Sequence, residues 1–184
     1  MSTLKKITCG LIVAALIAAC ASTPNMTTSA IPARGPNLGA APSPAMLAAM
    51  DISIPPSGAG LPTGSGSVAQ GQKVYEGKCQ ACHGSKGEGK PADPLVGGIG
   101  SLASGKPMRT VGSYWPYATT LFDYTRRAMP ATSPQSLTNE EVYAVTAYVL
   151  HLNGIVPETA VMNAQTLPQV KMPNRDGFID YSRK

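Results

Sequence analysis

Two cysteines and a histidine, Cys79, Cys82 and His83, lie within the stretch GKCQACHGSKGEG at residues 77–89. Two thiols three residues apart, with an imidazole directly after the second, suit a zinc site, a thiol–disulfide pair or a covalently attached haem. Structural zinc needs four ligands, and the only other histidine is His151. A thioredoxin-like pair belongs in a strand–helix–strand context, which the surrounding sequence does not show. The C-x-x-C-H pattern therefore favours one haem c, bonded to both cysteines, with His83 as proximal iron ligand.

The N-terminus, residues 1–20, has the pattern of an export signal. Two lysines precede the apolar run ITCGLIVAALIAA, which is too short to span a membrane. Covalent haem attachment in bacteria follows export, so the two signals agree. The run ends in IAAC, which resembles a bacterial lipobox and predicts that Cys20 is lipidated, with ordinary cleavage within AACAS as the alternative. We expect a location in the bacterial cell envelope, on the periplasmic side, anchored through Cys20.

The charge balance argues against nucleic acid as a partner. The formal net charge is +5, and removal of Lys5 and Lys6 with the signal lowers it to +3. Charged residues make up only 14% of the chain, and no basic run is longer than Arg126–Arg127. The composition indicates a mildly basic exported domain.

The segment 21–67 is expected to be a tether, because its first half is rich in Ala, Ser, Thr and Pro and cannot bury enough apolar surface to order itself. Fully flexible, it would reach about 35–40 Å. Within it, Ser43 and Pro44 form an N-cap and first-turn pair for a short helix. Met46, Leu47 and Met50 would share one face, as in a docked helix.

Residues 68–154 carry the elements that must position the motif. Helical spacing predicts one helix ending at the motif, a second over PYATTLFDYTRRA and a third over SLTNEEVYAVTAYVLHLNG. The third has Thr138 and Glu141 as a capping box and Gly154 at its end. No strand pattern appears in this domain, so we expect an all-α fold whose small core is completed by haem. The tail, residues 155–184, contains three prolines without helical spacing and is expected to be extended.

A sixth iron ligand must come from another side chain if the haem only transfers electrons. Met129 ends a predicted helix and precedes Pro130, which stiffens the chain beside the sulfur, and we predict that it is this ligand. The alternative role for Met129 is to fill a gap in the core. On its helix His151 points away from the apolar stripe. The remaining candidates are His151, Met108, Met162 and Met172.

The helix before C-x-x-C-H, the Gly/Pro-rich loop and the MP dipeptide before a final amphipathic helix resemble a class I cytochrome c. The resemblance implies that Gly71 and Tyr75 on the first helix cross the last helix at Val145 and Tyr148. It also implies that a loop proline carbonyl accepts the proximal histidine's proton, for which Pro94 fits best.

A narrower resemblance rests on SGAGLPTGSGSVAQG, VGSYWPYATTLFDYTRRAMP and KMPNRDGFI. These strings are similar to the cytochrome subunits of sulfite dehydrogenases and of the sulfur dehydrogenase of the thiosulfate-oxidising system. The resemblance implies a molybdenum subunit as electron donor and flanking segments that help to present the haem edge to it. Trp115 lies in a turn, and its indole N–H needs a partner if buried; we predict a haem propionate, with simple core packing as the alternative.

Single-electron transfer is the function that these features favour. A haem held by His and Met has no open site, and Met ligation favours a high potential. Lys78, Arg126 and Arg127 are placed to steer an acidic partner. A generic tethered carrier to a terminal oxidase is the main alternative. A peroxidase or gas sensor would need a distal acid–base pair, which the sequence does not supply, and a lipoprotein with purely structural haem is a further alternative.

Overall fold

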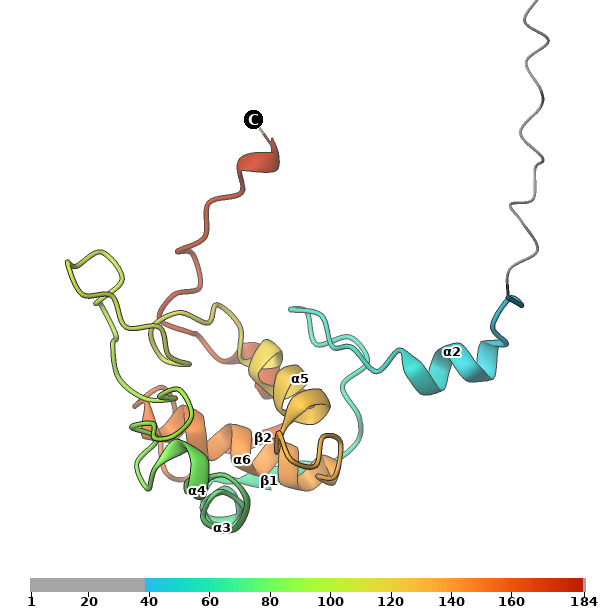
Figure 1. The fold of residues 1–184 in the computed structure, drawn as a ribbon, viewed down its shortest axis with the longest axis horizontal. Helices are drawn as coiled ribbons and strands as arrows, with labels where there is room; N and C mark the ends of the chain where they lie inside the picture. The colour runs from blue at the N-terminus through green and yellow to red at the C-terminus, as the bar shows by residue number, and fades with distance from the viewer. Residues whose placement is uncertain (1–38, 184) are drawn as a thin grey trace, which may run out of the picture. The chain divides into compact units, whose positions relative to one another are not determined.

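Three helices of the computed structural model, which describes residues 39–183, lie where the sequence predicts them (Figure 1). A short fourth helix directly follows the first of them and contains Cys82 and His83 of the C-x-x-C-H motif. The elements are α3 (Val68–Lys78), α4 (Gln80–His83), α5 (Ala118–Ala128) and α6 (Asn139–Leu152).

The last helix, α6, begins and ends as predicted. The Glu141 amide donates to the Thr138 hydroxyl at 3.2 Å, and the Thr138 amide donates to the Glu141 carboxylate at 3.0 Å, which completes the capping box. At the other end, Gly154 has a φ of 69°. The Ile155 amide reaches back to the Leu150 carbonyl at 3.0 Å, so the helix closes in a Schellman motif.

Helix α3 crosses α6 at Gly71, as the cytochrome resemblance implies. A Cβ atom built on Gly71 would overlap the carbonyl oxygen of Ala144 and crowd the Tyr148 side chain. The rings of Tyr75 and Tyr148 lie 5.3 Å apart at 56°. The contact at Gly71 is therefore made by Ala144 and Tyr148, while Val145 faces a cavity.

The core lies between α5, α6 and the segment after α6. Its largest side chains are fully enclosed, and the rings of Phe122 and Tyr143 lie 4.5 Å apart. The fully enclosed large apolar or aromatic residues are Tyr75, Tyr143, Phe122, Leu150, Leu167 and Val142.

The C-terminal flank, residues 155–175, contributes to this core. Strand β1 (Ser65–Ser67) pairs antiparallel with β2 (Val161–Asn163), so the two ends of the helical domain are tied together. The turn η2 (Leu167–Gln169) follows, and Leu167 is fully buried. Met162 and Met172 are also buried, so this part of the tail packs on the domain instead of leaving it. The last described turn is η3 (Tyr181–Arg183).

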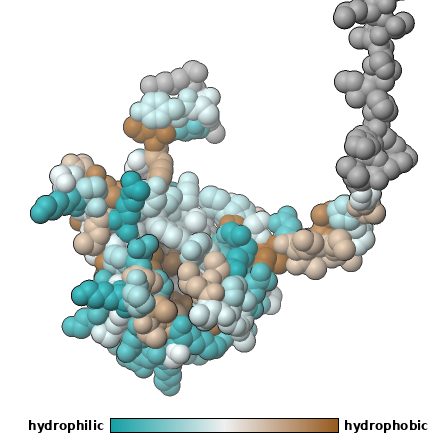
Figure 2. Space-filling view, viewed as in Figure 1, coloured by the Kyte–Doolittle hydropathy of each residue, from teal (hydrophilic) through white to brown (hydrophobic). Residues whose placement is uncertain are grey.

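The N-terminal flank, residues 43–67, contains the predicted short helix, α2 (Pro44–Met50). The Met46 amide donates to the Ser43 hydroxyl at 3.1 Å, which confirms the predicted cap. The helix is not docked, however. Met46, Leu47 and Met50 are 52–76% exposed, and no residue of α2 is buried (Figure 2). The apolar face of α2 is therefore exposed, and the first buried residue after the helix is Ile54.

The predicted signal, the predicted lipidation site Cys20 and the first part of the tether lie outside the described residues. Within residues 39–183, no helix combines the length and the apolar character that crossing a membrane requires.

Candidate functional site

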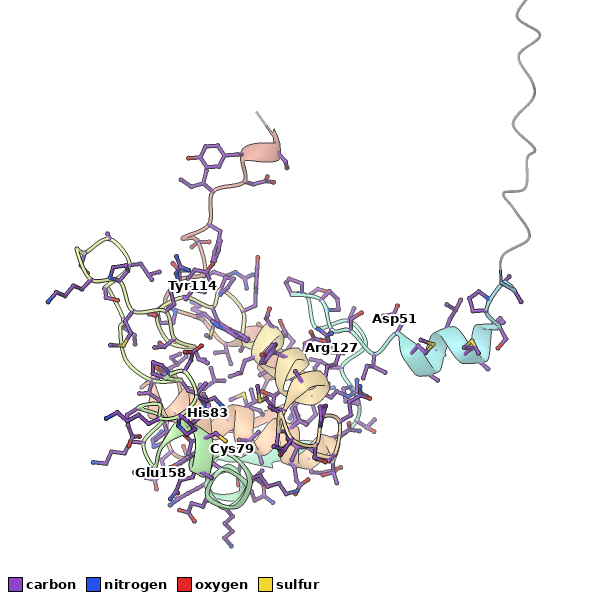
Figure 3. The ribbon with its side chains drawn as sticks, in the orientation of Figure 1. Asp51, Cys79, His83, Tyr114, Arg127 and Glu158 are labelled. Carbon is purple, nitrogen blue, oxygen red and sulfur yellow. The ribbon has the colours of Figure 1, made fainter. Side chains whose placement is uncertain are left out.

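The motif stands at the junction of α3 and α4. Cys79 is the C-cap of α3, and its carbonyl accepts the amides of Cys82 at 3.1 Å and His83 at 3.0 Å. The Tyr75 hydroxyl donates to the Gly84 carbonyl at 2.8 Å, which ties α3 to the residue after His83. The two thiols and the imidazole are thus held on one tightly hydrogen-bonded turn (Figure 3).

The imidazole of His83 is oriented by a backbone carbonyl. Its Nδ1 lies 2.9 Å from the carbonyl oxygen of Asp93, which leaves Nε2 free to bind a metal. The sequence interpretation assigned this role to the carbonyl of Pro94 and was wrong by one residue. The Ala92 amide donates to the Cys82 carbonyl at 2.9 Å. This bond fixes the path of the loop so that the Asp93 carbonyl reaches the imidazole ring.

A cavity of about 630 Å³ opens beside the motif and has mostly apolar walls. This volume is within the range of cofactor sites. Walls come from α3 and α4, from the loop around Leu95, from residues 109–115, and from α5 and α6. All six predicted cofactor-binding residues line it, namely Cys79, Cys82, His83, Pro94, Trp115 and Met129.

Met129 reaches this cavity from the end of α5. It is the C-cap of the helix, its amide donates to the Thr125 carbonyl at 3.1 Å, and its own backbone is extended. The side chain is half-buried. The structure thus brings a thioether and an imidazole to one cavity, as the sequence predicts for the two axial ligands.

The other candidate ligands lie elsewhere. Met162 and Met172 are buried in the core outside the cavity, and Met108 is 46% exposed. His151 is half-buried instead of solvent-facing, with Nδ1 3.2 Å from the Val156 carbonyl.

The thiol of Cys79 does not have the low pKa of a redox-active cysteine. Burial raises the pKa of Cys79 to about 11, with Lys78 lowering it in part and Cys82 raising it further. A catalytic thiol needs a lowered pKa so that it ionises near neutral pH. Cys79 is instead a neutral, half-buried thiol at the wall of an apolar cavity, which fits a covalent attachment point.

The cavity also contains an unsatisfied polar atom. Thr146, on α6, is 1% exposed, and its Oγ1 has no hydrogen-bond partner among the described residues. Buried hydroxyls are normally paired, so this one fits a site that a bound group or water completes. Apolar walls, two thiols, an imidazole and a thioether together fit a haem.

Comparison with known proteins agrees with this geometry. The cytochrome c family model matches residues 68–153. A chain in the crystal structure of the sulfane dehydrogenase SoxCD from Paracoccus pantotrophus is 40% identical, with a TM-score of 0.74. That match covers 81% of this chain and 74% of the other. This chain belongs to the cytochrome c family. No curated protein sequence matches it.

The cytochrome therefore has the class I fold and carries covalently bound haem c. Cys79 and Cys82 stay the predicted attachment points, and His83 and Met129 the predicted axial ligands. Trp115 packs edge-to-face on Tyr124, with ring centroids 5.6 Å apart. Its bond to a propionate stays a prediction.

The three cations expected to steer a partner are each engaged within the cytochrome. Lys78 pairs with Glu141 at 2.6 Å and Arg127 with Asp123 at 2.5 Å. Arg126 donates to the Ile52 carbonyl at 3.3 Å. The carboxylates offset much of the field of Lys78 and Arg127, so these two are weaker steering groups than the sequence indicates, whereas the neutral Ile52 carbonyl leaves the charge of Arg126 in place.

Sequence reasoning missed three residues that build the site. Asp93 orients His83 through its main-chain carbonyl, and because any residue type has this carbonyl, the sequence does not reveal the role. Arg109 lines the cavity and stands over the Tyr114 ring at 5.5 Å, but it lies in an irregular loop without any pattern. One sequence feature could have identified Thr146, because its hydroxyl lies on the otherwise apolar face of α6.

Proposed function

We propose that this cytochrome is an exported, membrane-anchored electron carrier that takes single electrons from a sulfur-compound dehydrogenase and passes them to a respiratory acceptor. Its catalytic partner would be the molybdenum subunit that the sequence resemblance implies. The cytochrome itself would bind no substrate.

The observation that carries this proposal is the extent of the match to the SoxCD chain. The cytochrome c model covers residues 68–153, less than half of the 184 residues, whereas the SoxCD match covers 81%. The similarity therefore extends into flanks that a minimal cytochrome does not need. This supports a shared assembly role beyond a shared haem domain.

The residues would act as follows. Haem c supplies a one-electron couple. Cys79 and Cys82 fix its position, the Asp93 carbonyl holds the His83 ring, and Met129 completes the coordination, which favours a high potential. Apolar walls exclude water from the site.

Membrane attachment through Cys20 completes the proposal. A single acyl chain anchors weakly and several anchor firmly, and bacterial lipoproteins carry two or three. The segment that follows would let the haem domain sample partners near the membrane. Cys20→Ser should release the cytochrome from membranes, and an intact mass with haem but without acyl groups would contradict the anchor.

Stopped-flow reduction tests the electron-transfer role. The ferric cytochrome should be reduced by a purified molybdenum sulfur dehydrogenase only when that enzyme has its sulfur substrate. The ferric protein should show the Met–iron charge-transfer band and lose it on reduction, and Met129→Ala should retain haem, lower the potential and open the iron to carbon monoxide. No reduction by any such dehydrogenase, with rapid oxidation by a terminal oxidase, would favour the generic carrier instead. A wild-type protein that binds carbon monoxide stoichiometrically would contradict Met129 ligation.

Haem staining of denaturing gels tests the attachment. Cys82→Ala should lose the stain, and stain retained in the Cys79→Ala, Cys82→Ala double variant would rule out these thioethers.

A further inference from the structure

Three hydrogen bonds join α5 to a short part of the N-terminal flank, residues 52–56, which we call the strap. The Ile54 amide donates to Asp123 Oδ1 at 2.8 Å. The other two bonds run from Thr119 Oγ1 to the Pro56 carbonyl at 3.1 Å and from Arg126 Nη1 to the Ile52 carbonyl at 3.3 Å. The strap is therefore fastened along the length of α5, on side chains one turn apart.

Asp123 is the centre of this arrangement. It is 7% exposed, and both of its oxygens are used, because Arg127 Nε donates to Oδ1 at 3.0 Å and Arg127 Nη2 donates to Oδ2 at 2.5 Å. Burial alone would raise the pKa of Asp123. The hydrogen bonds from Arg127 and the Ile54 amide, with the charges of Arg127 and Arg126, outweigh burial and hold this pKa below its usual value. The carboxylate is thus charged and fully paired at neutral pH.

Two of the residues in this arrangement, Arg126 and Arg127, lie on the last turn of α5, directly before the predicted ligand. Arg126 and Arg127 are three and two residues before Met129, which caps the helix. The last turn of a helix has unpaired carbonyls and frays readily. Fraying here would move the Met129 sulfur. Figure 3 shows Arg127 on the side of α5 toward the segment that follows Asp51.

Helix α5 has three faces, and the face that binds the strap differs from those that face the core and the cavity. Phe122 packs in the core against Tyr143, and Leu121 and Thr125 line the cavity. Core packing therefore holds the body of α5 without the strap. What the strap adds is restraint of α5 on the face that carries Asp123, up to Arg126 in the last turn.

We infer that Asp123 is a positioning residue for Met129, because it holds both the strap and Arg127, a residue of the last turn of α5, and so keeps the thioether at the haem iron. The inference rests on Met129 being the axial ligand, as proposed above. It gives residues outside the minimal cytochrome domain a role at the haem.

The test compares purified Asp123→Asn and Arg126→Ala holoproteins with wild type. Asn keeps the side-chain volume but turns an N–H group toward the Arg127 donors, so the bidentate pair is lost. The fraction of ferrous protein that binds carbon monoxide should rise about ten-fold in Asp123→Asn, since hydrogen bonds between charged groups are among the stronger ones. The Met–iron charge-transfer band should be lost at lower pH than in wild type, and the reduction potential should fall. Arg126→Ala removes one bond to the strap and should show a smaller shift in the same direction.

Glu158→Gln is the matched control, because it removes one exposed negative charge far along the chain from α5. It should behave as wild type. A lowered melting temperature in Asp123→Asn, with carbon monoxide binding and band unchanged, would make Asp123 merely structural and overturn the inference. If Asp123→Asn does not fold, unchanged carbon monoxide binding in Arg126→Ala overturns it instead. A wild-type iron already open to carbon monoxide would overturn Met129 ligation itself, which is a different result from unresponsive variants.

Discussion

The two flanks of the haem domain are attached by different forces. The C-terminal flank inserts side chains into the core, where Met162, Leu167 and Met172 are 0–4% exposed. The N-terminal flank buries only Ile54 among its large apolar residues and is held mainly by its backbone, through the amide of Ile54 and the carbonyls of Ile52, Pro56 and Pro62. Apolar burial is strong but non-directional, whereas hydrogen bonds contribute less and fix geometry. The C-terminal flank should therefore determine stability, and the N-terminal flank should determine alignment.

The sharpest way to break this comparison is to delete the C-terminal flank. Truncation after Gly154 removes three buried side chains, each worth roughly 1.5–3 kcal/mol, which together approaches the 5–15 kcal/mol stability of a whole domain. It also removes β2. We expect no cooperative unfolding transition by circular dichroism. The control is truncation after Gly177, which keeps Met162, Leu167 and Met172 in place and should leave a folded cytochrome. A stable product of the longer deletion would show that the helices hold the core alone.

Gly66 tests a place where the N-terminal flank is packed tightly against α6. It pairs with Met162 across the two strands, and a Cβ built on it would overlap the backbone of Ala144. Gly66→Ala should lower the free energy of unfolding by about 1–3 kcal/mol, the usual cost of overpacking. Gly105→Ala is the control, because nothing lies within 4 Å of a Cβ there. Equal stability of the two variants in denaturant titrations would mean that β1 can shift without loss.

The sequence predicts the elements of this molecule better than the contacts between them. The helix α6 is encoded locally, since Thr138, Glu141 and Gly154 are all within or beside it, and this prediction is confirmed. The burial of Met162 and Leu167 is not encoded that way. A three-residue strand and a single turn are too short to show a period, and their partners lie far away in the chain. For the same reason the pairing of Lys78 with Glu141 was not visible.

At the site, the side chains that line the cavity were predictable, but the position of the backbone carbonyl that binds His83 was not. The C-x-x-C-H spacing and the MP dipeptide led to residues that share one cavity. The acceptor for His83 was misplaced by one residue, because it is a main-chain carbonyl in a loop whose path depends on several backbone bonds.

Tyr143 tests a single directional bond of the N-terminal flank. Its hydroxyl donates to the Pro62 carbonyl at 2.8 Å. Tyr143→Phe keeps the ring in the core and should cost about 1 kcal/mol in the free energy of unfolding. Tyr148→Phe is the control, because no hydrogen bond of its hydroxyl is seen. Hydrogen exchange of the Gly64–Ser67 amides should quicken in the first variant only, and unchanged exchange in both would remove Pro62 as an anchor.

The smallest effect is expected for Lys78 and Glu141, an ion pair outside both flanks that contrasts with Asp123 and Arg127. The side chains of Lys78 and Glu141 are 40% and 28% exposed, so water screens their attraction and the pair should contribute only about 0–1 kcal/mol. The Lys78 hydrogen bond, aided by the Thr138 amide, lowers the pKa of Glu141 in the folded state. Because the pKa of Glu141 is lower in the folded state, the ion pair stabilises the fold fully at pH values above the pKa of the unfolded state. This stabilisation is lost as the pH falls through the pKa of the folded state. Glu141→Gln should therefore lower stability slightly at pH 7, less so in high salt, and not at all in strong acid. The Arg127 side chain is 45% exposed, but the Asp123 carboxylate is buried and also accepts the Ile54 amide, so most of the effect of Asp123→Asn should persist in salt. If salt weakens both pairs equally in parallel denaturant titrations, the strap is a surface contact and the contrast between the flanks fails.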